Sequence, residues 1–400
     1  MDYIHLMAFL LCVCSVMVLR AGLALFEAGL SRSKNAASAV MWVLCDLGVA
    51  TLAFWAFGAA ILMQNSNGYL GIRCDLIASS DIGILSYLCL AVLGSGIVSG
   101  MLAERARFTV VAPLSLLMAA VLIPVVGHWV WFGFLARLGV LDVGGALPLH
   151  LAAATVGLVG AWMIGPRHGK YNKDGSANGI PGHSIPLMGA GVLIMLPAWA
   201  GYLVLASVMR APETMPQAVL NALLASAAGV VASMVYGAVR YGKPEVFLAL
   251  LGLIGGMVSV SAGAGTVPAW AAVLLGVAAG VAVPWVAIAF DLHLHIDDPS
   301  GAGASFGAGS IISLIGAAIL RDGSFAERFR TLGANLFGIV VTVVLSATLA
   351  WGLFTVLRRY TKIRSTEADE YDGLDLAEHD INAYPDFQQT MIKSYHLREA

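Results

Sequence analysis

The stretch DVGGALPLHLAAATVGLVGA at Asp142–Ala161 has a counterpart later in the chain, DPSGAGASFGAGSIISLIGA at Asp298–Ala317. At an offset of 156 residues, the leading aspartates, two glycines, three alanines and one leucine match. Because glycine and alanine are abundant throughout the chain, the paired aspartates carry most of the evidence. The match predicts an internal repeat, in which His150 of the first copy corresponds to Phe306 of the second.

The composition around these stretches indicates a polytopic membrane protein. The chain has 400 residues, of which 59% are hydrophobic and 12% are charged, against about 25% charged residues in soluble domains. Its mean hydropathy is +0.84. The formal net charge of −2 and the dispersed basic residues exclude a nucleic-acid partner, which would require a Lys/Arg-rich face.

Apolar runs separated by charges and turn residues predict an all-α fold with eleven transmembrane helices in the lipid bilayer. The fifth and tenth spans carry the repeat and run in opposite directions. We therefore expect two inverted five-helix halves, with the eleventh helix outside them and a substrate site between them. The predicted spans are 4–26, 36–63, 82–103, 109–132, 147–165, 185–208, 217–239, 246–263, 269–290, 302–320 and 333–357.

The distribution of Lys and Arg predicts the orientation. One set of alternate loops, which includes Arg167, Lys170 and Lys173, carries thirteen Lys/Arg, and the other set carries six. Because the richer loops face the cytoplasm, we expect a protein of the cytoplasmic (inner) membrane with its N-terminus outside. The expected domains are a transmembrane domain at 1–360 and a cytoplasmic tail at 361–400.

His150 is the leading candidate for chemistry within the membrane. A buried histidine can be a satisfied core residue, but an ionisable side chain at membrane depth is a functional candidate by default. A second imidazole could exchange a proton with it, whereas the ring of Phe306 has neither donor nor acceptor. A relay between paired histidines is therefore not expected at this place.

Other polar and aromatic residues suggest further roles. Trp131 and Tyr202 lie where a small cation could meet an aromatic face, while Trp129 fits an interfacial aromatic belt better. Arg20 and Asp46 fall at comparable depths in the first two spans, so we expect an ion pair that acts as a structural clamp or in regulation.

No metal site, cofactor or enzymatic activity is expected. The sequence from Asp291 to Asp298 contains two histidines and three aspartates, but the HxH spacing at a helix end points the two imidazoles apart. Loop residues and a cap for the tenth span explain it better. The chain has no phosphate loop, nucleophile elbow or CxxC pair.

Several motifs together resemble the Amt/Rh ammonium transporters over nearly the whole chain. They are GLALFEAGLSRSKNA at Gly22–Ala36, SGMLAERARF at Ser99–Phe108, HWVW at His128–Trp131, Leu141–Ala161, SAGAG at Ser261–Gly265, DDP at Asp297–Pro299, and DGLDLAEHDINAY at Asp372–Tyr384. The resemblance implies eleven helices, a homotrimer, ammonium as the ligand, and one narrow apolar pore per subunit.

Carried over residue by residue, the resemblance makes Trp131 the recruiting tryptophan, Asp142 and Asp298 structural residues near the site, and His150 the first pore histidine. The remaining pore positions depart from the family pattern. Phe306 replaces the second histidine, Leu90 and Tyr202 replace the two gate phenylalanines, and Ala206 ends the stretch that is usually FNAGS.

These departures support an ammonium-binding sensor on a transporter scaffold that conducts weakly or not at all. The alternative is an ammonium channel with a one-histidine pore, regulated by a PII-type protein; a third reading is a scaffold subunit without ligand binding. Apolar residues in the tail suggest the start of a signalling helix that leads to a kinase or cyclase output domain. They are Phe387, Met391, Ile392 and Leu397.

Overall fold

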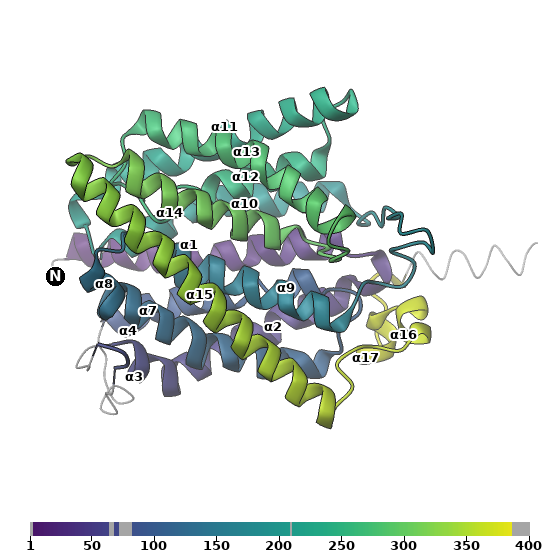
Figure 1. Cartoon of the computed structure of the whole chain (residues 1–400). Coiled ribbons are helices and arrows are strands. Elements are labelled where there is room, and N and C mark those ends of the chain that lie inside the picture. Colours follow the sequence, from purple (N-terminus) through teal and green to yellow (C-terminus); the bar gives the residue numbers. More distant parts are fainter. Residues whose placement is uncertain (1–2, 64–67, 72–81, 209, 386–400) are drawn as a thin grey trace, which may run out of the picture.

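The computed structural model describes residues 3–63, 68–71, 82–208 and 210–385. In these ranges the chain forms helices joined by turns and loops, with two isolated β-bridges, Ala106–Arg364 and Tyr171–Ala177. Most helices run side by side along one axis, and α15 crosses them obliquely (Figure 1). The tail stripe predicted at Phe387–Leu397 lies outside the described residues.

The first half of the bundle contains five spans, four of which include a π-helical turn or a break. Its elements are α1 (Tyr3–Leu30), η1 (Ser33–Asn35), α2 (Ala36–Ala53), η2 (Phe54–Gly58), α3 (Ala59–Leu62), α4 (Ile82–Ser95), α5 (Ser99–Leu102), η4 (Phe108–Val110), α6 (Val111–Leu116), η5 (Leu117–Leu122), α7 (Ile123–Trp131), α8 (Phe134–Leu138), η6 (Ala146–Leu151) and α9 (Ala152–Ile164).

The second half repeats this plan and is followed by the extra helix and the tail. Its elements are α10 (Ile185–Val208), η7 (Pro212–Thr214), α11 (Met215–Tyr241), α12 (Val246–Val258), α13 (Ala269–Leu292), η8 (Gly303–Ala308) and α14 (Gly309–Leu320), then α15 (Phe325–Tyr360), α16 (Glu367–Asp372) and α17 (Leu374–His379).

The all-helical membrane fold predicted from the sequence is confirmed. Among the described residues, ten helical segments are long and apolar enough to cross a bilayer. The predicted eighth span corresponds to α12, which has only 13 residues because the chain turns after Val258. The last helix begins at Phe325 rather than at residue 333, because Ser324 and Glu327 form a capping box that starts it within the charged segment.

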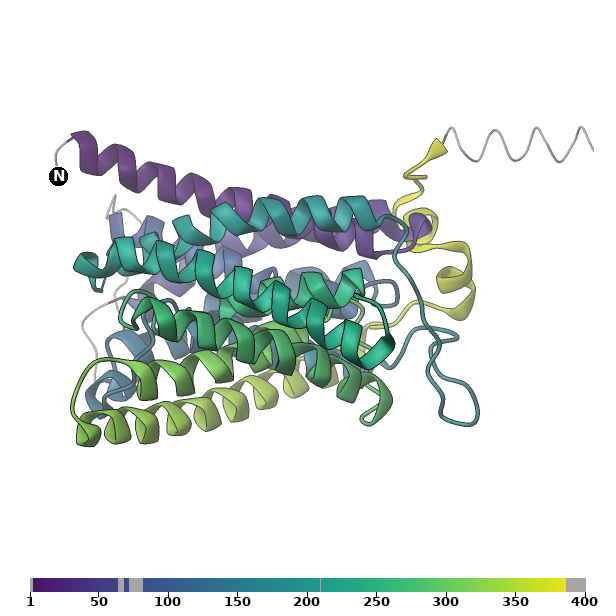
Figure 2. The ribbon, with the colours of Figure 1, turned by 90° about the horizontal axis from the view of Figure 1, so that it is seen from above.

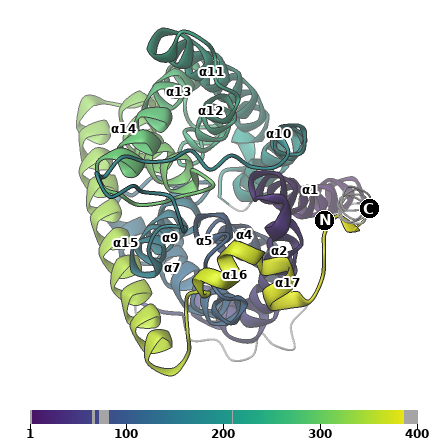
Figure 3. The same cartoon turned by 90° about the vertical axis from the view of Figure 1, so that its right-hand side faces the viewer.

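The helices divide into two groups when the bundle is seen along its axis. Figure 3 shows α11, α12, α13 and α14 in one group and α2, α4, α5, α7 and α9 in the other. Helices α1 and α10 pack against each other between the groups, and α15 packs against α9 and α14. The two π-helical turns η6 and η8 contact each other where the halves meet.

The two ends of the bundle differ. The short helices α16 and α17 lie at one end, here called the tail end, whereas α8 and the start of α1 lie at the opposite end (Figures 1 and 2). Strand-like pairing of Ala106 with Arg364 and contacts of α17 with α2 attach the tail to the bundle.

Candidate functional site

The π-helical turn η6 carries His150 and is held by Asp142. The Asp142 carboxylate accepts backbone hydrogen bonds from Gly145 (2.8 Å), Ala146 (2.7 Å) and Leu147 (2.8 Å). Gly145 has φ of +87°, a conformation that glycine adopts without steric cost. A carboxylate that satisfies free N–H groups at a helix start fixes how the helix enters the bundle.

The second repeat builds η8 in the same way. The Asp298 carboxylate accepts from the Gly303 N–H (2.7 Å) and from the Ser300 hydroxyl (2.9 Å), and Gly301 has φ of +63°. The aspartates and the left-handed glycines thus match at the offset found in the sequence. Their shared geometry brings His150 and Phe306 to the same level, with ring centroids 5.6 Å apart.

His150 is fully buried in a set of aromatic rings. Its imidazole stacks on Trp199, with centroids 5.2 Å apart and 21° between the planes. Tyr202 meets it edge-on at 5.8 Å, and Phe306 closes a third side. Trp199, Tyr202 and Phe306 are themselves buried, so this aromatic cluster leaves little open space at the level of His150.

Hydrogen bonds around Tyr202 assign the proton on His150. The Tyr202 hydroxyl donates to the Gly144 carbonyl, so its oxygen accepts from His150 Nε2 at 3.1 Å. In a neutral imidazole the other nitrogen, Nδ1, is then an acceptor. Among the described residues, Nδ1 has no hydrogen-bond partner. One buried acceptor therefore remains for a small donor such as ammonia, ammonium or water.

Trp131 lies near the opposite end of the bundle, and its indole is held from both sides. Its Nε1 donates to the Asp142 carbonyl at 3.0 Å, and its ring lies 5.5 Å from that of Tyr87. The guanidinium carbon of Arg210 lies 3.7 Å from the ring centroid of Trp131 and 5.3 Å from that of Tyr87. A cation of the protein itself therefore covers the indole face.

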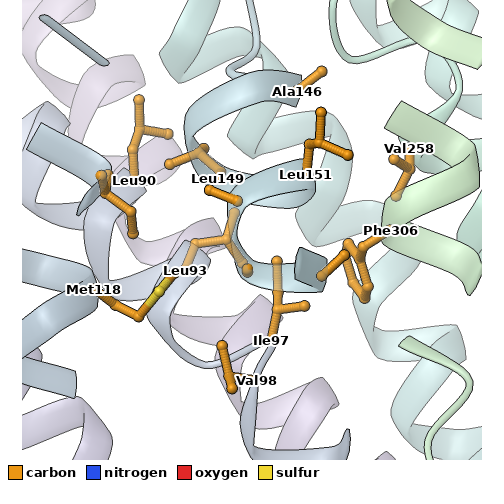
Figure 4. Close-up of a cluster of buried hydrophobic side chains, with 14 of the residues drawn as sticks. Leu90, Leu93, Ile97, Val98, Met118, Ala146, Leu149, Leu151, Val258 and Phe306 are labelled. Carbon is orange, nitrogen blue, oxygen red and sulfur yellow. The ribbon is translucent and has the colours of Figure 1, made fainter. Parts of the chain in front are cut away.

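The remaining predicted pore residues occupy different places. Leu90 is buried in the apolar cluster that surrounds η6 and includes Phe306 (Figure 4). Ala206 is buried, and its carbonyl accepts from Arg210. Tyr202, predicted to bind ammonium together with Trp131 and to replace a gate phenylalanine, contacts the rings of His150 and Trp199, and its part in ammonium binding stays a prediction.

Arg20 and Asp46 lie together inside the first half. Arg20 Nη2 is 2.6 Å from Asp46 Oδ2, and both side chains are buried. The hydroxyls of Ser95 and Ser115 donate to the same carboxylate at 3.1 and 2.7 Å. The guanidinium occupies the space beside Gly96, where a Cβ atom would overlap it. This cluster links α1, α2, α4 and α6.

Two of the three aspartates at Asp291–Asp298 have basic partners at the tail end. Asp291 pairs with Lys170 at 2.8 Å, and Asp297 pairs with Arg167 at 2.9 Å. Arg167 also lies 3.1 Å from Glu104. Burial opposes ionisation of Asp297, but Arg167 and Arg105 outweigh it and lower its pKa to about 2. The pKa of Glu104 is lowered as well, against its burial, by Arg167 and Arg32.

A cavity of about 600 Å³ adjoins this ion cluster at the tail end. Its walls come from α10, α12, α13 and the loop before α10, and they are mostly apolar. Its charged lining consists of Arg167, Lys170, Glu245, Asp291, Asp297 and Asp298. The cavity and the aromatic cluster are thus separate features of the fold.

The tail packs over the tail end of the bundle through specific polar contacts. The Asp375 carboxylate accepts from the backbone N–H groups of Ala37 (3.1 Å) and Ser38 (2.6 Å), at the start of α2. The carbonyl oxygen of the Asn35 side chain accepts from the Leu374 N–H at 2.8 Å. The tail therefore caps a helix of the transmembrane domain.

An inverted-repeat helical bundle with an aromatic-lined histidine between its halves is a membrane transport fold. Residues 7–384 match the model of the Ammonium Transporter Family, and the chain belongs to this family. It is therefore a multi-pass membrane protein of the class that performs Amt-type ammonium transport or sensing.

Individual relatives agree with this assignment. The chain is 33% identical to ammonium transporter Amt2 of Archaeoglobus fulgidus over 94% of its length and 87% of the relative's. It is 28% identical to an ammonium transporter of Bacillus subtilis, with 94% and 97% covered. Among solved structures, a sensor Amt protein superposes with a TM-score of 0.89 at 26% identity, covering 93% of this chain and 97% of that one.

Sequence reasoning gave no role to Trp199 or Arg210. Trp199 lies near the middle of a span, away from the interfacial belt where tryptophan is common, and three residues before Tyr202. Those two features could have indicated an inward-facing ring. Arg210 counted only as a loop charge, and nothing in the pattern indicates that its side chain turns back onto Trp131.

Proposed function

We propose that the protein is an ammonium-binding sensor whose central passage conducts ammonium weakly or not at all. The observation that carries this proposal is the enclosure of His150 by Trp199, Tyr202 and Phe306. An ammonium ion that crosses an apolar passage must lose its water shell or its proton, and each step needs polar partners at the narrowest point.

Phe306 changes the chemistry at that point. An imidazole there could accept a proton or a hydrogen bond, whereas the phenyl ring offers only apolar surface. Its centroid lies 6.3 Å from that of Trp199 as well as 5.6 Å from that of His150. The ring thus removes a polar partner and also fills space beside the remaining histidine.

The docked tail supports the signalling part of the proposal. A ligand shifts a conformational equilibrium only if it binds the two states with different affinity. The contacts of Asp375 with the start of α2, and of Leu374 with Asn35, tie the tail to helices that also frame the transmembrane interior. Movement of α2 on binding would change the capping of that helix by the tail.

The assembly and orientation form part of the same proposal. We place the protein as a homotrimer in the cytoplasmic membrane, with its N-terminus outside and its tail in the cytoplasm, where a PII-type protein or a fused kinase or cyclase domain could respond to it. The excess of Lys/Arg in the loops on the tail side supports this orientation. Labelling of introduced cysteines in intact cells would test it.

The decisive experiment compares ammonium binding with ammonium-driven current. The wild-type chain, Phe306→His and Phe306→Leu would be reconstituted at equal density and examined by calorimetry and by currents on a supported membrane. We expect all three to bind ammonium, and only Phe306→His to give clear currents. The leucine variant controls for ring size. Wild-type currents equal to those of Phe306→His would overturn the proposal.

A one-histidine ammonium channel is the second candidate. The unpaired acceptor Nδ1 of His150 favours it, because a buried acceptor can bind a passing donor. The currents of the wild-type chain decide between the two functions. In a channel they would saturate with ammonium and disappear in His150→Leu.

A further inference from the structure

Arg210 holds a position that an incoming cation would otherwise occupy. It follows α10 by two residues, and its guanidinium carbon lies 3.7 Å from the centroid of the Trp131 ring. The ring of Tyr87 lies 5.3 Å from the same carbon. Both distances fall within the range of about 6 Å in which a cation is attracted to an aromatic face.

The guanidinium is anchored by two backbone carbonyls and by a hydrogen bond with the side chain of Tyr87. Nη1 donates to the carbonyls of Val143 and Ala206, each at 3.0 Å. Nε and Nη2 have no hydrogen-bond partner among the described residues. A fully bonded guanidinium would be costly to move, whereas this one keeps its place through the aromatic faces, the two carbonyl contacts and the hydrogen bond with Tyr87, and two of its nitrogen atoms remain unbonded within the described part of the chain.

We propose that Arg210 sets the affinity of the Trp131–Tyr87 site by competing with external ammonium-type cations for it. One aromatic face cannot hold two positive charges in contact without strong repulsion. A small cation therefore binds there only when the guanidinium leaves the indole. The inference rests on the proposed function, because it takes ammonium and its methylated forms as the ligands.

This competition sets a threshold for binding. The free energy lost when Arg210 leaves Trp131 reduces the net binding free energy of the incoming cation. The site is therefore occupied only at a higher cation concentration. A departing guanidinium also releases the carbonyls of Val143 and Ala206, which lie just before η6 and near the end of α10. Occupation of the site is thereby linked to the segments that carry His150 and Tyr202.

The test is calorimetry on the full chain in lipid nanodiscs with ammonium chloride and methylammonium chloride. Arg210→Gln should bind both cations about tenfold more tightly, a change within the range of one cation–π contact. Arg330→Gln removes the same charge from an exposed position on α15 and should bind as the wild type does. The double variant Arg210→Gln, Trp131→Leu should lose the tighter binding of Arg210→Gln, because the indole that binds the cation is absent.

Arg210→Lys keeps the charge without the planar group that stacks on the indole, and it should have an intermediate affinity. The thermal midpoint of Arg210→Gln would show whether that variant folds. If it does not fold, Arg210→Lys provides the comparison with the wild type. Equal affinities of the wild type, Arg210→Gln and Arg210→Lys would overturn the inference and leave the proposed function intact. Binding by Arg210→Gln but not by the wild type would support the inference and overturn the proposed function.

Discussion

The imidazole of His150 lies stacked on the indole of Trp199, with ring centroids 5.2 Å apart and 21° between their planes. Both side chains are fully buried, and they come from different halves of the repeat: His150 from η6 and Trp199 from α10. The stack therefore joins the halves at the level of the candidate site, with Phe306 beside it.

Trp199→Ala should destabilise the protein and loosen the aromatic cluster. Loss of a buried tryptophan side chain leaves a cavity and typically costs about 3–5 kcal/mol. Thermal unfolding in detergent should show a clearly lower midpoint, and ammonium flux into liposomes should rise because one wall beside His150 is gone. Trp199→Phe keeps an aromatic wall and should change both readouts less. An unchanged flux in a folded Trp199→Ala protein would show that this wall does not close the passage.

The general plan of the fold could be predicted from the sequence because hydropathy marks spans directly. The predicted helix ends were wrong where two features of the sequence indicated different structures. Charges at Glu327 and Arg328 indicated a loop, but the capping box of Ser324 starts α15 there. Likewise, the apolar run after Val258 indicated a longer helix, whereas the chain turns. Apolar character shows that a segment is withdrawn from water, but it does not show where a helix ends.

The site was less predictable, for a physical reason. The repeat related His150 to Phe306 because main-chain geometry is encoded locally by the aspartates and glycines that precede them. The contacts of Trp199 and Arg210 depend on how α10 is rotated against η6 and on the path of the chain after Val208. A single sequence gives the side chains of a helix but not which turn of it faces a given neighbour.

Breaking the Arg20–Asp46 pair on one side should cost more than removing it. Arg20→Met leaves the Asp46 carboxylate buried with two serine hydroxyls as its remaining partners, and such a change typically costs about 3–5 kcal/mol. The double variant Arg20→Met, Asp46→Leu removes both charges and should unfold at a higher temperature than Arg20→Met. A double-mutant cycle on thermal midpoints measures the difference. Equal midpoints for the single and double variants would contradict a coupled pair.

Acid should weaken the tail end through Asp297. Its pKa is lowered to about 2, so its ionised form is favoured in the folded protein. The stabilisation is then complete above the unfolded pKa of about 4 and disappears as the pH falls through about 2. The unfolding midpoint should stay level from pH 7 to about 5 and then decline. In Asp297→Asn the midpoint should be lower at pH 7 and the decline shallower, whereas Asp322→Asn, at an exposed position, should follow the wild type.

Asp375 should control how firmly the tail binds the bundle. Its carboxylate accepts from two free N–H groups at the start of α2, and loss of such a cap typically costs about 0.5–2 kcal/mol. Asp375→Ala should therefore speed hydrogen exchange in α16, α17 and the first turn of α2 by several-fold. Asp375→Asn keeps one acceptor oxygen and should lie between this variant and the wild type, while Asp372→Asn changes an exposed residue and should have no effect. If Asp375→Ala speeds exchange in the tail but not in α2, the carboxylate anchors the tail without stabilising the helix, and the proposed link from ligand binding through α2 to the tail fails.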